Sequence, residues 1–96
     1  MTKAEIVDII ANSTGLTKVE TEHVVNGFLS TVKEALTQGK HIDLRGFGRF
    51  KVVERKRRAG RNPRTNELVE IPEQHVPVLK FSKDFRADVN DSLAKS

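Results

Sequence analysis

Residues 54–67 gather six cationic side chains, a density of positive charge that suits the binding of an anionic polymer. The six cations are Arg55, Lys56, Arg57, Arg58, Arg61 and Arg64. Two acids, Glu54 and Glu67, accompany them, no large apolar side chain interrupts them, and Pro63 lies near the middle. Burying these like charges together would desolvate all of them at a large cost in free energy. The stretch is therefore predicted to project into solvent or onto a polyanion.

Other chemistries have little support in the sequence. The chain has no cysteine, which excludes disulfides and thiolate metal sites. Its histidines are scattered without the spacing of metal ligands, and they are His23, His41 and His75. The aspartates within residues 83–94 cannot be combined with a nucleophile and a base, so a solvated helix face is the better interpretation. We expect no metal, no cofactor, no small-molecule substrate and no enzymatic activity.

Length and composition favour one small domain that needs a partner. The 96 residues allow a single domain, and 36% of them are hydrophobic, with five Phe and no Trp or Tyr. If about 20 residues project, about 75 remain, and a body of that size is marginally stable on its own. Obligate oligomerisation is therefore expected.

The charge is distributed unevenly along the chain. The net charge is +4 and the pI about 9.7, which favours an anionic partner. Residues 1–50 carry six cations and six acids, so the excess lies in the second half, above all in residues 51–65. No apolar run approaches the roughly 18 residues of a membrane span, and no signal peptide is visible. We therefore expect a cytoplasmic protein that does not contact a membrane.

Two helices are predicted before the basic stretch. Residues 2–5 match a capping box and Gly15 suits a C-terminal cap, which predicts a helix over residues 3–14. A second capping box at residues 17–20 predicts a helix over residues 18–38. At about 100° per residue, the apolar side chains of the second helix fall within an arc of about 140°. They are Val24, Val25, Phe28, Leu29, Val32, Ala35 and Leu36. This stripe is wide enough to face both its own sheet and a second subunit.

The hydrophobic period changes to two after the second helix. Alternation over residues 41–44 and 49–53 predicts two strands, and it resumes over residues 68–81. Between them, residues 54–67 lack the apolar member of the alternation. The pattern predicts a hairpin whose base is amphipathic and whose distal half is polar and cationic.

The end of the chain predicts an edge strand and a closing helix. Pro72 and Pro77 suit edge positions or bulges, because proline cannot donate a ladder hydrogen bond. Ser82 can cap a helix over residues 83–94. The apolar residues of this helix recur at i, i+4 and i+8, and they are Phe85, Val89 and Leu93.

The spacing of glycine, aromatic, arginine and proline residues over residues 46–65 resembles the signature of the bacterial HU and integration host factor proteins. The matching residues are Gly46, Phe47, Gly48, Arg49, Phe50, Arg55, Arg58, Gly60, Arg61, Asn62, Pro63, Arg64 and Thr65. The resemblance extends over essentially the whole chain. It implies an α+β fold with two N-terminal helices, a three-stranded antiparallel sheet with a long β-hairpin arm, and a short C-terminal helix. In the single domain 1–96, residues 1–53 and 76–96 would form the body of an intertwined dimer, and residues 54–75 the DNA-binding arm.

The same resemblance implies an architectural protein without cofactors, which clamps and bends double-stranded DNA and organises the nucleoid. In this family, as is known, each arm lies in the minor groove and a proline wedges between base pairs. Pro63 would be that wedge. The other implied DNA contacts are Arg49, Arg55, Lys56, Arg57, Arg58, Arg61, Asn62, Arg64, Lys80, Lys83 and Arg86. The expected dimer core comprises Val25, Phe28, Leu29, Val32, Leu36, Phe47, Phe50 and Leu79.

Two positions depart from the family pattern. Asn66 occupies a tip position where the family usually has Gly, and Asn tolerates the left-handed backbone, so the turn is expected to survive. Phe81 and Ser82 replace the usual proline-glycine run, which changes the region where the last helix begins.

Alternatives to these interpretations remain open. Isolated Lys/Arg clusters are usually solvated charge runs, and an Asn-Pro dipeptide is common in plain turns, so only the resemblance favours a wedge at Pro63. A helix-turn-helix is disfavoured, because residues 18–38 carry two lysines against three glutamates. The alternative function is a site-specific subunit of the integration host factor type, in a homodimer or a heterodimer. Such a subunit would act in recombination, replication or transcription regulation through indirect readout of DNA deformability.

Overall fold

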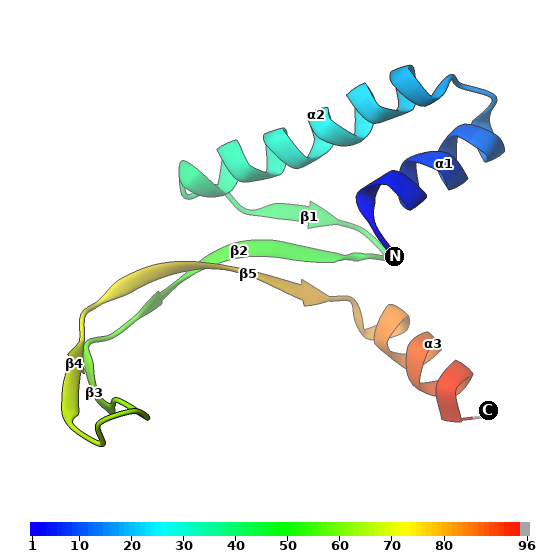
Figure 1. Cartoon of the computed structure of the whole chain (residues 1–96). Helices are drawn as coiled ribbons and strands as arrows, with labels where there is room; N and C mark the ends of the chain where they lie inside the picture. The colour runs from blue at the N-terminus through cyan, green and yellow to red at the C-terminus, as the bar shows by residue number, and fades with distance from the viewer. Residues whose placement is uncertain (95–96) are drawn as a thin grey trace. The chain divides into compact units, whose positions relative to one another are not determined.

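The computed structural model describes residues 1–94, which contain three helices and five strands (Figure 1). The elements are α1 (Lys3–Thr14), α2 (Lys18–Thr37), β1 (Ile42–Leu44), β2 (Gly48–Arg55), β3 (Arg58–Arg61), β4 (Leu68–Ile71), β5 (Gln74–Phe81) and α3 (Lys83–Ala94). The chain divides into two compact units, Met1–Ala35 and Leu36–Ser96. The order of helices and antiparallel strands confirms the predicted α+β class.

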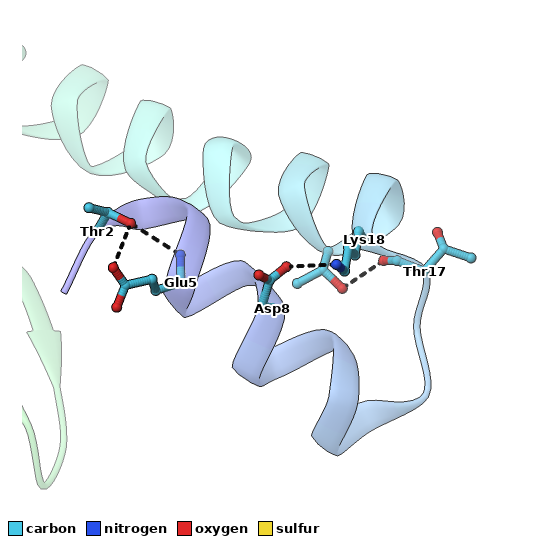
Figure 2. Close-up of polar contacts among 6 residues, drawn as sticks. Thr2, Glu5, Asp8, Thr17 and Lys18 are labelled. Carbon is cyan, nitrogen blue, oxygen red and sulfur yellow. Dashed lines mark hydrogen bonds and ion pairs between the residues drawn. The ribbon is translucent and has the colours of Figure 1, made fainter.

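Helix α1 has the bounds that its capping residues predict. The Thr2 hydroxyl accepts a hydrogen bond from the Glu5 backbone N–H at 3.3 Å. Gly15 ends the helix in the left-handed region at φ 78°, with its N–H donating to the Ala11 carbonyl. The Thr2 hydroxyl also lies 3.4 Å from the Glu5 carboxylate, so the two side chains of the capping box meet each other (Figure 2).

Helix α2 begins with a reciprocal capping box. The Glu20 N–H donates to the Thr17 hydroxyl at 3.1 Å, and the Thr17 N–H donates to the Glu20 carboxylate at 3.3 Å. Hydrogen bonds from the Thr17 side chain and backbone lower the pKa of Glu20, because they stabilise its ionised form. The helix ends at Thr37, one residue before the predicted end.

Polar contacts join α1 to α2 at two places. The ammonium group of Lys18 lies 3.3 Å from a carboxylate oxygen of Asp8 (Figure 2). The ammonium group of Lys3 donates to the Asn26 side-chain oxygen at 2.9 Å. These contacts are exposed, and each contributes little to the free energy of folding. They specify how the two helices pair, but they add little to the stability of the pair.

A single chain buries very little apolar surface. Within residues 1–94, Val7 and Ala11 are the only buried hydrophobic side chains, and Thr21 is the only buried polar one. The stripe of α2 remains open, with Phe28 47% and Leu29 43% exposed. Large apolar side chains at this level of exposure on one face are characteristic of an interaction surface. The exposure therefore supports, without testing, the prediction that the stripe packs against a second subunit.

The predicted three-stranded antiparallel sheet is present, in the order β1-β2-β5. Its register places Arg49 opposite Lys80 and Phe50 opposite Leu79. Because side chains alternate between the two sides of a strand and opposite residues share a side, the sheet has two unlike faces. Phe50, Val52, Pro77 and Leu79 share the apolar face. The other face, here called the cationic face, carries Arg49, Lys51, Arg55 and Lys80 together with Val53, Val76 and Val78.

Gly48 is required where β2 meets β5. A Cβ atom at this position would lie 2.7 Å from the Lys80 carbonyl oxygen, closer than such atoms approach one another in proteins. Any larger residue would therefore push the two strands apart at the start of their pairing, next to Arg49.

The arm is divided into two parts. Strands β2 and β5 remain paired as far as Arg55 and Gln74, which is beyond the predicted start of the arm at residue 54. After a break at residues 56–57 and 72–73, β3 and β4 form a separate two-stranded sheet. Pro72 lies in this break, because it has no N–H to continue the ladder. Pro77 lies in β5, an edge strand, as predicted.

Ser82 organises the start of α3, as predicted. Its hydroxyl accepts a hydrogen bond from the Phe85 N–H at 3.2 Å and donates to the Gly46 carbonyl at 3.2 Å. Its backbone N–H donates to the Phe47 carbonyl at 2.8 Å. The rings of Phe47, Phe81 and Phe85 pack together, with centroids 5.2 to 5.7 Å apart. This cluster secures α3 to the turn between β1 and β2.

Candidate nucleic-acid interface

The tip of the arm, residues 61–67, is a closed turn around Pro63. The Asn62 N–H donates to the Glu67 carbonyl at 2.9 Å, and the Asn66 N–H donates to the Asn62 carbonyl at 2.7 Å. The Asn62 side-chain oxygen accepts from the Arg64 N–H at 2.9 Å. These bonds hold the backbone on both sides of Pro63, whose ring is exposed. Pro63 is thus a turn proline that also presents an apolar, rigid surface to the outside.

Asn66 adopts the backbone conformation that its position requires. Its φ is 61°, in the left-handed region, as expected where the family usually has Gly. Its side-chain oxygen accepts a hydrogen bond from a guanidinium nitrogen of Arg61 at 3.3 Å. Asn66 therefore both closes the turn and orients a neighbouring cation.

The six cations of the arm are all exposed, as the desolvation argument predicts. Arg58 and Arg61 lie three positions apart in β3, so their side chains leave opposite sides of the strand. Positive charge is therefore present on both sides of the arm. This distribution suits a groove with phosphates along both walls better than a single flat anionic surface.

Arg57 differs from Arg61 because its internal partner is a carboxylate. Its Nε lies 3.0 Å from a carboxylate oxygen of Glu70, and both side chains are about two-thirds exposed. An exposed pair of this kind contributes at most about 1 kcal/mol. A phosphate can therefore replace Glu70 at a small cost.

The cationic face of the sheet continues the charge of the arm towards α3. Arg49, Lys51 and Lys80 border one hollow of about 330 Å³ on this face. Arg49 also pairs with Asp43 of β1 at 3.1 Å. Lys51 borders the same hollow but is not among the DNA contacts that the sequence implies. Its alternation with Arg49 and Arg55 in β2 was the signal that could have identified it.

Lys83 and Arg86 occupy the first turn of α3 and are exposed. Three positions apart on a helix, they share one side of it. Arg86 also borders an apolar hollow of about 270 Å³ with Phe81, Phe85 and Val89. The implied contacts Lys80, Lys83 and Arg86 thus gather where β5 passes into α3, next to the Ser82 cap.

Two carboxylates meet at the break in the arm. A hydrogen bond to the Glu54 side chain, and then repulsion from its charge, raise the pKa of Glu73. His75, opposite Glu54 in the register, acts in the other direction. The two carboxylates at the base of the arm therefore disfavour each other's ionised form.

The residues of the expected dimer core differ in how exposed they are in the single chain. Phe28, Leu29, Phe47 and Leu79 are exposed, and Val25, Val32, Leu36 and Phe50 are half-buried. None of these eight is fully buried. The assignment of these residues to a dimer interface therefore remains a proposal that their exposure supports.

Within residues 1–94, no group of three or more histidines and acids has the arrangement of a metal site. None of the three helices described is long and apolar enough to span a bilayer.

Comparison with known proteins places the chain in a family. The family described as bacterial DNA-binding protein matches residues 1–90. DNA-binding protein HU of Clostridium pasteurianum is 43% identical over 90 residues, covering 94% of this chain and 99% of the relative. Integration host factor subunit beta of Marinobacter nauticus is 40% identical over 96 residues, covering 99% of this chain and 98% of the relative.

A solved structure agrees with these relatives. An Anabaena HU–DNA cocrystal structure is 44% identical, has a TM-score of 0.86, and is matched over 93% of this chain and 97% of that one. The resemblance inferred from residues 46–65 is confirmed, and with it the expectation of a DNA-binding protein that is not an enzyme. This chain belongs to the bacterial DNA-binding protein family that includes HU and integration host factor.

Proposed function

We propose that this protein is an architectural DNA-binding protein, which acts as a dimer to bind and bend double-stranded DNA with weak sequence preference. Each arm enters the minor groove, and the cationic face and the start of α3 hold the phosphates of the bent duplex. In the cell it compacts and organises the nucleoid in the cytoplasm. The DNA complex of the Anabaena relative supports this proposal, since it is similar over almost the whole chain.

The observation that carries the proposal is the exposed, cationic hairpin with a braced proline at its tip. An arm with guanidinium groups on both sides can neutralise both phosphate walls of a narrow groove. Arg49, Lys51 and Lys80 extend the positive surface onto the sheet. A duplex that contacts both the tip of the arm and these groups on the sheet would need to curve. We therefore propose that binding bends the DNA.

Pro63 is proposed as the wedge that lowers the free-energy cost of bending the duplex. Separating a base step costs a few kcal/mol, and extra contacts along the bent duplex must offset that cost. A proline ring held by hydrogen bonds on both sides of it loses little further entropy when it inserts. The bracing by Asn62 and Asn66 is therefore as important as the ring itself.

Replacing Pro63 with Ala should reduce the bend angle more than the affinity. The substitution removes the apolar wedge but keeps all six arm cations, which supply most of the binding free energy. We expect about a 3- to 10-fold loss of affinity, together with a clearly smaller bend in energy-transfer measurements on end-labelled duplexes. Pro77→Ala, in the body part of β5, is the matched control and should change neither. A Pro63→Ala protein that bends DNA as the unchanged chain does would disprove the wedge.

A site-specific role of the integration host factor type is the second candidate. It is favoured by the 40% identity to integration host factor subunit beta over nearly the whole chain. A subunit of that kind would recognise sequence-dependent deformability, alone or with a different partner chain. Gel shifts on random and on defined duplexes separate the two candidates. Equal affinity for all of them excludes the site-specific role, and a preference of about 10³-fold for one site excludes the non-specific one.

A further inference from the structure

Glu54, Glu73 and His75 meet where the backbone pairing of the arm is interrupted. In the register of β2 and β5, Glu54 lies directly opposite His75, so these two side chains leave the sheet on the same side. Glu73 precedes β5 by one residue, and its side chain is hydrogen-bonded to that of Glu54. This bond joins the two sides of the arm at the break, residues 56–57 and 72–73.

The hydrogen bond between the two acids requires a proton. An ionised carboxylate can only accept hydrogen bonds, so two carboxyl groups bond to each other only when one of them is protonated. When both are ionised, they repel each other at the same place. The contact between β2 and the residue before β5 is therefore attractive with the proton and repulsive without it.

Backbone pairing does not compensate for this change at the break. The last pair of the β2–β5 ladder is Arg55 with Gln74, and the next pair along the arm is Arg58 with Ile71. Pro72 has no N–H with which to add a hydrogen bond between them. The side-chain contact therefore has a large share in how firmly β3 and β4 are held to the three-stranded sheet.

Other charges around the two acids modify this contact without replacing it. They belong to β2, the break, β4 and β5, and they are Arg55, Lys56, Arg57, Glu70 and His75. Arg55 follows Glu54 in β2 and leaves from the other side of the strand, and Arg57 is paired with Glu70. A positive charge on His75 favours the ionised form of Glu73 and so opposes the hydrogen bond.

We propose that Glu54 and Glu73 form a proton-sensitive latch across the break of the arm. With a shared proton the latch is closed and holds β3 and β4 to the sheet. With both acids ionised it opens and lets β3 and β4 move.

The use of this latch in DNA binding rests on the proposed function. Phosphates near the arm would favour the protonated pair, because their negative potential opposes the ionisation of a carboxyl group. Binding of DNA would then close the latch and take up a proton. The affinity for DNA would rise as the solution becomes more acidic.

The direction of the pH dependence follows from the hydrogen bond. The bond to Glu54, and then the charge of Glu54, raise the pKa of Glu73. A carboxyl group whose pKa is raised in the folded protein contributes stability that is fully present below the ordinary pKa of glutamate. This contribution is lost as the pH rises through the raised value. The latch is therefore closed in acid and opens as the pH increases.

Two substitutions of Glu73 fix the latch in its two states. In Glu73→Gln the side-chain amide can donate to the Glu54 carboxylate without a shared proton, so the latch stays closed. In Glu73→Ala the partner of Glu54 is missing, so the latch stays open. Both variants remove the same negative charge, and a difference between them therefore reports the hydrogen bond. Glu67→Gln and Glu67→Ala, at an exposed acid of the tip, are the matched control pair and should behave alike.

The first test follows the arm without DNA. Steady-state heteronuclear NOE values of the backbone amides of β3 and β4 report how firmly these strands are held. In the unchanged protein they should be higher at about pH 5 than at about pH 7.5, in line with the loss of the proton. They should be high at both in Glu73→Gln and low at both in Glu73→Ala. Equal values in these two variants would overturn the inference.

His75→Gln separates the latch from the histidine, which titrates in the same range of pH. The substitution removes a charge that favours ionised Glu73, so the response of β3 and β4 to pH should persist. A response that disappears in His75→Gln would make the histidine the sensor and overturn the inference.

The second test measures the affinity for a duplex of about 20 base pairs, long enough for a body and two arms. At about pH 7.5, Glu73→Gln should bind about 3-fold more tightly than Glu73→Ala, the modest gain expected of one exposed hydrogen bond. When Glu54→Ala is added to both variants, this ratio should fall to one. A ratio that stays the same without Glu54 would overturn the inference. A protein whose arm responds to pH in the first test, but which binds no duplex, would support the latch and contradict the proposed function.

Discussion

Raising the salt concentration from about 50 to about 200 mM should lower the affinity for duplex DNA by about 10³- to 10⁵-fold, if 6 to 10 phosphates are contacted. Each phosphate that an arginine or lysine neutralises releases a condensed counterion, and this release weakens as salt rises. Two arms with six exposed cations each, together with the cationic face, offer more than enough partners. Titrations at several salt concentrations measure the slope directly. A loss below about tenfold would show that the cations are not the main source of affinity.

The slope should be smaller than the number of cations suggests, because two of them already have internal counterions. Arg57 pairs with Glu70 and Arg49 with Asp43, so binding exchanges one anion for another at these positions. Glu70→Gln should therefore raise the affinity about 2- to 5-fold at low salt and steepen the salt dependence. Glu34→Gln, which removes an exposed acid of α2 that is not part of the arm, is the matched control. An unchanged slope in Glu70→Gln would mean that Arg57 makes no phosphate contact.

Placing a charge in the stripe of α2 should abolish the dimer. In Phe28→Asp a symmetric interface would contain two copies of the new carboxylate. Desolvating each copy costs several kcal/mol. We expect the dimer dissociation constant to rise by on the order of 10³-fold or more. Because one chain buries so little by itself, cooperative unfolding should disappear together with the dimer. Sedimentation equilibrium and circular dichroism report the two effects separately.

Val19→Asp provides the control for this experiment. Val19 is 65% exposed and lies on α2 outside the stripe, in the first turn, where an acid is favoured by the helix dipole. The variant should remain dimeric with a stability within about 0.5 kcal/mol of the unchanged protein. A Phe28→Asp protein that remains dimeric with the same thermal midpoint would place the subunit interface elsewhere.

The bounds of the helices and strands could be predicted closely because they depend on interactions between residues that are near one another in the sequence. Thr2, Thr17 and Ser82 are capping residues, and the helices that follow them begin where these residues predict. The strands could be predicted from the alternation of apolar and polar residues, because only one face of the sheet packs against apolar groups. The end of α2 differs by one residue, since the last turn of a helix has weaker local signals than the first.

The break in the arm could not be predicted from alternation. The apolar alternation ends at Val53, but the hydrogen-bonded ladder of β2 and β5 continues to Arg55 and Gln74. Backbone pairing depends on the register and on Pro72, not on whether a side chain is apolar. For the same reason the sequence did not single out Lys51, which only the pleat of β2 places on the cationic face beside Arg49.

The tip shows a further limit of sequence reasoning. That Asn66 would accept the left-handed conformation could be foreseen from its residue type. Its hydrogen bond with Arg61 could not, because that contact depends on how the turn places two side chains five residues apart. The identity of the second subunit is likewise absent from the sequence, since an exposed apolar stripe does not specify which chain covers it.

The small number of buried side chains has a consequence for how the cell would control the amount of this protein. Because Val7, Ala11 and Thr21 are the only buried side chains larger than glycine within residues 1–94 of a single chain, folding requires a second chain and becomes concentration-dependent. Newly made subunits that do not dimerise would remain unfolded and susceptible to proteolysis, so degradation would remove surplus chains. Where two different subunits are made in unequal amounts, the scarcer one would then set the level of the assembled pair.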